Sequence, residues 1–112
     1  MGVVHAQRAD REGNVQLWGI VGVQKEVVLA SERSIVTVEE VVDELTPVPG
    51  AVVMPSWTVD AVCLVPHGAH PSYAHGYYDR DNDFYVRWDA ISRDRDAFRA
   101  WMEEHVLAKA AA

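Results

Sequence analysis

Apolar residues follow two spacings along this chain, and each spacing predicts a different kind of element. Strict alternation and short β-branched runs are typical of strands, whereas apolar residues three or four positions apart are typical of helices. The first spacing predicts strands at Val3–Arg8, Val15–Trp18, Ser34–Val38, Ala51–Met54 and Val59–Val65. Between the first two, Gly13 and Asn14 suit the positive φ of a tight reversal, so we expect a hairpin there.

Helical spacing occurs in three stretches. Val23–Glu32 has apolar residues at positions 23, 27 and 30, which predicts a helix with one buried stripe, and Asp81–Ile91 and Asp94–Leu107 predict a C-terminal helical pair. The two carboxylates of Glu39 and Glu40 favour the start of a short helical turn. Together these elements predict an α/β fold: a single domain over residues 1–112, with an open mixed sheet of about five short strands, flanking helices and at least one crossover.

Polar chemistry is concentrated in the segment after the last predicted strand. Val59–Val65 is a nearly continuous apolar run, which predicts a buried strand, and it leads into a Pro- and Gly-rich loop. Three of the five histidines and three of the four tyrosines lie between Pro66 and Tyr78. Because ligands of open α/β sheets bind beyond the carboxyl ends of strands, this loop is the first candidate for a binding site.

Charge and composition exclude several classes of function. A net charge of −7 argues against a nucleic-acid surface and against docking on anionic lipid. No apolar run approaches the length of a membrane-spanning helix. The single cysteine, Cys63, excludes an intrachain disulfide and suits a reducing compartment, so we expect a cytoplasmic protein.

Two groups of residues invite specific chemistry. His67, His70 and His75 could hold a metal ion, although their spacing matches no established ligand pattern and separate hydrogen-bonding histidines are the alternative. Glu39 and Glu40, beside a strand end, form a carboxylate pair at the rim of the predicted sheet, and either could act as a nucleophile or general base.

Residues 5–14 form a predicted strand followed by an Ala-Asp-x-x-Gly-Asn turn. Four further segments follow in order: Gln24–Glu26, Ser34–Asp43, Val59–Val62 and Pro66–Ser72. Together these segments resemble class I coenzyme A-transferases, the two-subunit family that includes glutaconate and 3-oxoacid CoA-transferases. The chain looks most like the C-terminal portion of an A (alpha) subunit, nearest to the glutaconate-type branch.

The resemblance implies covalent catalysis in which a glutamate attacks an acyl-CoA thioester and passes coenzyme A to a second carboxylic acid. That glutamate normally lies in a Ser-Glu-Asn-Gly motif of the B subunit, and A subunits normally carry a Gly-Gly-Phe motif; this sequence contains neither. We therefore expect a B-subunit partner, an oligomer, acyl-CoA as substrate and no permanently bound cofactor. Candidates for the substrate pocket or interface are His5, Gln7, His67, His70, Ser72, Tyr73 and His75.

Other functions stay open at this point. Relatives of this kind also act as hydrolases or ring-opening enzymes on CoA thioesters. A metal-binding module built on the loop histidines and a non-catalytic interaction domain are two further alternatives.

Overall fold

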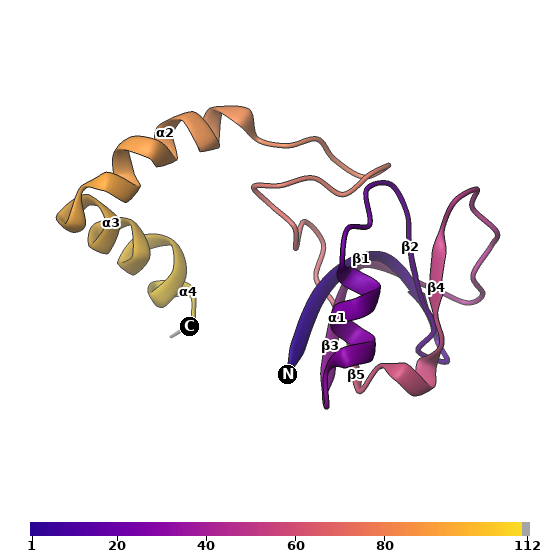
Figure 1. The fold of residues 1–112 in the computed structure, drawn as a ribbon. Coiled ribbons are helices and arrows are strands. Elements are labelled where there is room, and N and C mark those ends of the chain that lie inside the picture. The colour runs from indigo at the N-terminus through magenta and orange to yellow at the C-terminus, as the bar shows by residue number, and fades with distance from the viewer. Residues whose placement is uncertain (111–112) are drawn as a thin grey trace. The chain divides into compact units, whose positions relative to one another are not determined.

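The computed structural model describes residues 1–110 and groups the chain into two compact units. The first unit runs from Met1 to Asp79 and contains the sheet, and the second begins at Arg80 and is helical (Figure 1). Within the described residues, no helix is both long enough and apolar enough to span a membrane.

The first unit is built on a five-stranded mixed sheet with the strand order β4-β2-β1-β3-β5. β1 (Gly2–Asp10) is central; it pairs antiparallel with β2 (Val15–Leu17) and parallel with β3 (Ser34–Val42). β4 (Val52–Met54) lies antiparallel beside β2, and β5 (Ala61–Leu64) lies parallel beside β3. The predicted α/β fold, its open mixed sheet and its hairpin are confirmed.

Side-chain hydrogen bonds close the hairpin between β1 and β2. One carboxylate oxygen of Asp10 accepts from the backbone N–H of Glu12 at 3.0 Å and of Asn14 at 2.9 Å, and the other accepts from the Asn14 amide at 2.8 Å. Gly13 takes a φ of +88°, which glycine adopts without steric cost. Asn14 also accepts from the N–H of Ser56 at 2.9 Å, which joins the turn to the short 3-10 helix η1 (Ser56–Thr58).

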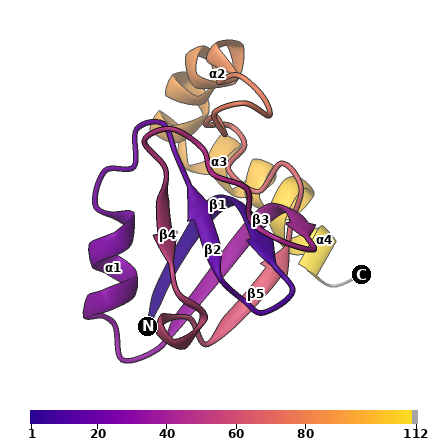
Figure 2. The same cartoon turned by 90° about the vertical axis from the view of Figure 1, so that its right-hand side faces the viewer.

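The helix α1 (Gln24–Ala30) connects β2 to β3 and packs on β1 (Figure 2). The predicted helix is confirmed, but its predicted buried stripe is correct only at Val27, which packs against the core, because Ala30 is exposed. Val28 is its buried residue, at 2% exposure, whereas Val23 is 68% exposed. Val28 belongs to a core of aliphatic side chains from the helix and from β1, β2, β3 and β4: Val4, Ala6, Ala9, Val15, Leu17, Val36, Val38 and Met54.

Two further strand predictions need correction. β3 continues through Glu39 and Glu40 to Val42, so the predicted helical turn is wrong; pairing with β1 as far as Asp10 holds these residues extended. β5 is an edge strand rather than a buried one, because no strand covers its outer side. Its Leu64 is 58% exposed and Cys63 is exposed as well.

The second unit contains the predicted helical pair. α2 (Asn82–Arg93) and α3 (Arg95–Met102) begin at Asp81 and Asp94, whose carboxylates accept from the backbone N–H of Phe84 and Ala97. A π-helical stretch, η2 (Glu103–Leu107), and a short turn, α4 (Ala108–Ala110), follow. Aromatic rings join the two helices, with Trp88 and Trp101 centred 4.7 Å apart.

Candidate functional site

The site begins with three polar side chains on the two central parallel strands. His5 of β1 lies opposite Thr37 of β3, and Glu39 follows two residues later on the same face of β3. Nδ1 of His5 is 2.8 Å from the Thr37 hydroxyl, and Nε2 is 2.6 Å from Oε1 of Glu39. The parallel register of β1 and β3 therefore brings together residues that are more than thirty positions apart in the sequence.

Glu39 is the centre of this group. Its side chain is 3% exposed, and it accepts hydrogen bonds from three directions. Oε1 accepts from His5 Nε2 and from the Tyr78 hydroxyl, each at 2.6 Å, and Oε2 accepts from the backbone N–H of His67 at 2.7 Å. Because a buried carboxylate needs hydrogen bonds in place of water, these three donors are what allow Glu39 to lie inside the fold.

The same contacts shift two pKa values in opposite directions. Burial by itself would raise the pKa of Glu39, but the bonds from Tyr78, His67 and His5 outweigh it, and the pKa lies below its ordinary value. Burial and then the bond to Glu39 raise the pKa of Tyr78 to about 12. The structure therefore favours an ionised carboxylate beside a neutral phenol.

Glu40 has different surroundings from its neighbour. Its side chain is 45% exposed; it accepts a hydrogen bond from the Tyr77 hydroxyl at 2.6 Å, and Arg8 Nε lies 3.5 Å away. Burial and then the bond to Glu40 raise the pKa of Tyr77 to about 12. The Arg8 guanidinium also lies over the Trp18 ring, 4.9 Å from its centre.

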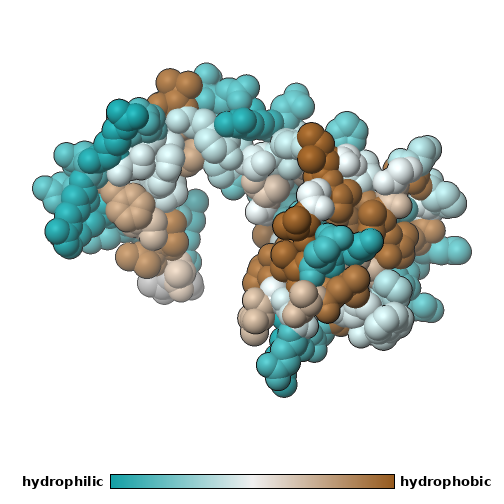
Figure 3. Space-filling view, viewed as in Figure 1, coloured by the Kyte–Doolittle hydropathy of each residue, from teal (hydrophilic) through white to brown (hydrophobic). Residues whose placement is uncertain are grey.

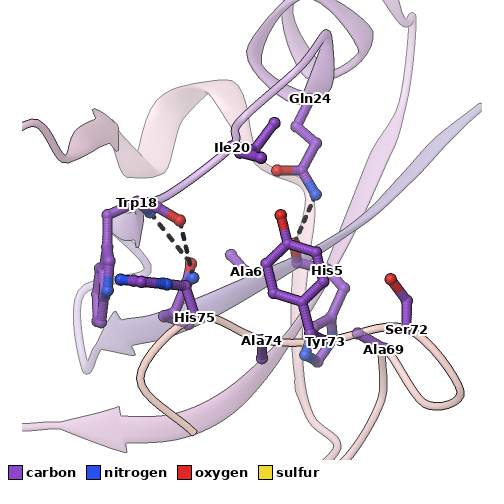
Figure 4. Close-up of a pocket in the computed structure, with 11 residues that line it drawn as sticks. His5, Ala6, Trp18, Ile20, Gln24, Ala69, Ser72, Tyr73, Ala74 and His75 are labelled. Atoms are coloured by element: carbon purple, nitrogen blue, oxygen red, sulfur yellow. Dashed lines mark hydrogen bonds between the residues drawn. The ribbon is translucent and has the colours of Figure 1, made fainter. Parts of the chain in front are cut away.

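The loop after β5 lies against this face of the sheet and encloses a pocket of about 290 Å³ (Figure 4). Close approach requires Gly68, since a Cβ at that position would lie 2.7 Å from the His5 ring. In Figure 4, Tyr73 lies between Ser72 on one side and His75 on the other. The pocket is lined by His5, Ala6, Gln7, Trp18, Ile20, Gln24, Ala69, Ser72, Tyr73, Ala74 and His75.

Some of these polar groups hold the pocket walls together. The Gln7 amide donates to the carbonyl oxygen of Trp18 at 2.9 Å and accepts from the Trp18 N–H at 3.2 Å. The Gln24 amide donates to the carbonyl oxygen of His5 at 2.9 Å (Figure 4). Both ring nitrogens of His5 are engaged as well, so this residue supplies a wall of the pocket rather than a proton donor or acceptor inside it.

Other polar groups face the pocket without such bonds. Over residues 1–110, no hydrogen bond within the chain engages the hydroxyls of Ser72 and Tyr73 or the ring of His75. No Asp, Glu, Lys or Arg is among the described residues that line the pocket. The arrangement suits a small polar organic group bound by hydroxyl and imidazole hydrogen bonds.

The structure brings five of the predicted site residues to one pocket: His5, Gln7, Ser72, Tyr73 and His75. His67 and His70 lie outside that set; the ring of His67 stacks on Tyr78, with ring centres 4.6 Å apart. Neither Glu39 nor Glu40 lines the pocket. In the part of the chain that is described, no three His, Cys, Asp or Glu side chains could hold a metal ion together, so the metal-binding alternative has no ligand set there.

The site residues predicted from the sequence did not include four that the structure places there. Thr37 and Tyr78 belong to the hydrogen-bonded network, and Trp18 and Gln24 line the pocket. Extending the predicted strand through Glu39 would have placed Thr37 and Glu39 on the same face, because side chains alternate along a strand. The contacts of Trp18, Gln24 and Tyr78 depend instead on chain reversals, which local sequence patterns do not specify.

Comparison with other proteins shows which family this arrangement belongs to. The chain is 62% identical over 104 residues to the A subunit of 3-oxoadipate CoA-transferase from Pseudomonas knackmussii, covering 93% of this chain and 37% of that protein. The crystal structure of glutaconate coenzyme A-transferase from Acidaminococcus fermentans matches with a TM-score of 0.80 and 38% identity, over 94% of this chain and 34% of that one. The crystal structure of a variant of the decarboxylase AibA/AibB matches with a TM-score of 0.65 and 32% identity, over 81% of this chain and 33% of that one.

The chain thus spans about a third of the length of each of these proteins. The model of the family described as coenzyme A transferase matches residues 1–64, which include every strand of the sheet in the described residues, as well as Glu39 and Glu40. On this match, and with the same fold in a solved member, the chain belongs to the coenzyme A transferase family.

Proposed function

We propose that this chain is part of the A subunit of a CoA-transferase, an enzyme that moves coenzyme A between an acyl-CoA and a carboxylic acid. The observation that carries the proposal is the 62% identity, along nearly the whole chain, to the A subunit of a 3-oxoadipate CoA-transferase. By the same similarity, 3-oxoadipate is the first acid to test. The chain would form the C-terminal portion of that subunit.

The pocket between β1 and the 67–78 loop is proposed to bind the acid or acyl part of the substrate. Its wall offers the Ser72 and Tyr73 hydroxyls and the His75 ring, which can bind carbonyl or carboxylate oxygens. The phosphates of coenzyme A are better bound by cations, and no Lys or Arg is among the described residues of the wall. We therefore assign the nucleotide end of the thioester to another part of the complex.

A B subunit is the proposed partner and the proposed source of the catalytic glutamate. Apolar side chains remain exposed on the first unit along the segment that contains α1, where Ile20, Val23 and Leu29 are 86%, 68% and 56% exposed. Figure 3 shows apolar surface gathered around this segment. Such a patch is suited to contact with another chain. The exposed Cys63 fits a cytoplasmic complex, and no permanently bound cofactor is needed.

Co-expression with the B subunit of a 3-oxoadipate CoA-transferase tests this function. The complex would be isolated by size-exclusion chromatography and assayed for CoA transfer from an acyl-CoA to 3-oxoadipate and, separately, to glutaconate. We expect co-elution and transfer to 3-oxoadipate, with each chain alone inactive. A complex that forms but transfers CoA to neither acid would overturn the proposal, as would a chain that does not bind the B subunit.

A decarboxylase is the second candidate, because the AibA/AibB decarboxylase shares the fold. The same complex distinguishes it: decarboxylation releases CO2 and leaves the thioester intact, whereas transfer moves the thioester to the added acid. A hydrolase or ring-opening relative would consume the thioester without an acceptor acid.

A further inference from the structure

Glu39 connects the sheet to both ends of the loop segment that forms the pocket wall. Wall residues of this loop run from Ala69 to His75. His67 precedes them and donates its N–H to Oε2, and Tyr78 follows them and donates its hydroxyl to Oε1. The Tyr78 oxygen in turn accepts from the N–H of Ala69 at 2.9 Å, so the two ends are also joined to each other.

The backbone at the first of these ends is in an unfavourable conformation. His67 has a φ of 60°, in the left-handed region that residues with a Cβ rarely adopt. A strained residue persists only where its surroundings hold it. Here the hydrogen bond from its N–H to a buried, ionised carboxylate and the stacking of its ring on Tyr78 hold it in place.

We propose that Glu39 is a positioning residue for the substrate pocket: its buried carboxylate holds the 67–78 loop on the sheet in the conformation that binds the acid, and the carboxylate itself takes no part in the chemical step. This inference rests on the proposed function, since the pocket must bind the acid for its affinity to be measured. Both oxygens of Glu39 accept bonds from inside the fold, and Glu39 itself does not line the pocket.

Glu40, the next residue along β3, provides a matched control for Glu39. Glu40 is on the same strand and also accepts a tyrosine hydroxyl at 2.6 Å, but it is half-exposed, and its two partners, Tyr77 and Arg8, are not among the described residues that line the pocket. The variants are therefore Glu39→Ala and Glu39→Gln with the control Glu40→Ala, and Tyr78→Phe with the control Tyr77→Phe. Tyr78→Phe keeps the ring on His67 and removes only the hydroxyl, so it serves if Glu39→Ala does not fold.

The experiment has one readout that does not depend on activity. Hydrogen exchange of the His67 and Ala69 amides is measured in the chain, because these N–H groups donate to Glu39 and to Tyr78. We expect exchange at both to quicken by about tenfold or more in Glu39→Ala, and at Ala69 in Tyr78→Phe, with little change in the two controls. Unchanged exchange at both amides would overturn the inference whether or not the complex is a CoA-transferase.

The second readout is steady-state kinetics of the complex with the B subunit. We expect Glu39→Ala to raise the KM for the acid by about tenfold while kcat changes less than about threefold, and Glu39→Gln to recover part of this loss because its amide can still bond to the loop. The controls should stay within about twofold in KM. If Glu39→Gln abolishes kcat as completely as Glu39→Ala, the carboxylate acts in the chemistry and the inference is wrong. If the unaltered complex transfers no CoA, the proposed function fails, and the exchange result alone decides whether Glu39 holds the loop.

Discussion

The hydroxyl of Tyr78 lies 2.6 Å from Oε1 of Glu39, and the Tyr77 hydroxyl lies 2.6 Å from Oε1 of Glu40. Two successive tyrosines of the loop therefore meet two successive glutamates of β3. Because side chains alternate along a strand, the two pairs lie on opposite sides of it. The Glu39 side chain is 3% exposed, whereas that of Glu40 is 45% exposed, so the two pairs have the same hydrogen-bond length but the bond to Glu39 should contribute more to stability.

Acid should destabilise the first unit through Glu39. Burial opposes ionisation, but hydrogen bonds outweigh it, and the folded pKa lies below the ordinary value of 4.5. The stability gained from this pKa shift is fully present above pH 4.5 and is lost as the pH falls through the lower pKa of the folded state. Asp10 in the hairpin turn contributes with the same sign, because its bonds to Asn14, Glu12 and Gly13 outweigh its burial and lower its pKa.

Thermal unfolding of the chain as a function of pH checks this. The midpoint temperature of unfolding should fall steadily as the pH is lowered from about 5 to about 2. Glu39→Gln should make this dependence of the midpoint temperature on pH less steep, because the glutamine does not titrate. If the midpoint temperature of Glu39→Gln depended on pH as steeply as that of the unaltered chain, Glu39 would not be a source of the acid destabilisation.

Alkali should act through the two loop tyrosines. Burial and then the bonds to Glu39 and Glu40 raise the pKa values of Tyr78 and Tyr77 to about 12, from an ordinary value of 10.0. The contribution of these two tyrosines to stability is fully present below pH 10.0 and is lost as the pH rises through about 12. Phenolate absorbance should therefore show two of the four tyrosines titrating late, and Tyr78→Phe should remove one of them. Titration of all four near their ordinary value would contradict this prediction.

Elements with a regular local pattern were predictable from the sequence. The hairpin followed from Gly13 and Asn14, and the helical pair followed from the spacing of Phe84, Trp88 and Phe98, because neighbours in the sequence determine both. The strand through Glu39 and Glu40 was missed for the opposite reason. Local preference favoured a helical turn, and pairing with β1 as far as Asp10 overrode it.

The candidate site was predictable only in part. Its loop was identified from the concentration of histidines and tyrosines, and five of the predicted residues lie at one pocket. The position of β5 at an edge, and with it the exposure of Cys63, depends on strand order, which an apolar run does not specify. The bond between Glu39 and Tyr78 joins residues 39 positions apart, and no local pattern encodes such a contact.

Trp88 should be the main packing residue of the second unit. Its ring lies 4.7 Å from that of Trp101, 5.6 Å from Phe84 and 6.0 Å from Phe98, so it contacts rings on both helices. Trp88→Ala should cost about 3 kcal/mol of that unit's stability, whereas Val86→Ala, at a position 76% exposed on the same helix, should cost less than about 0.5 kcal/mol. Amide exchange across residues 82–102 measures both, and equal protection in the two variants would contradict the prediction.

Gly68 should be required for the pocket because of the space it leaves for His5. A Cβ there would lie 2.7 Å from two atoms of the His5 ring and 2.8 Å from the carbonyl oxygen of Val65. The ring is held by Thr37 and Glu39, and a backbone carbonyl cannot turn aside, so the loop itself must move. Gly68→Ala should therefore cost about 1–3 kcal/mol and raise the KM of the assembled complex for the acid.

Gly50→Ala separates the loss of stability from the loss of the pocket. No atom lies within 4 Å of a Cβ at Gly50, but its φ is +73°, so alanine there should cost about 1–2 kcal/mol through backbone strain alone. Gly50 does not line the pocket, and its variant should keep the KM for the acid. The two proteins should then unfold at similar temperatures and differ in substrate affinity, because only Gly68→Ala moves the loop against His5. An unchanged KM in Gly68→Ala would mean that the loop binds substrate without its close approach to the sheet.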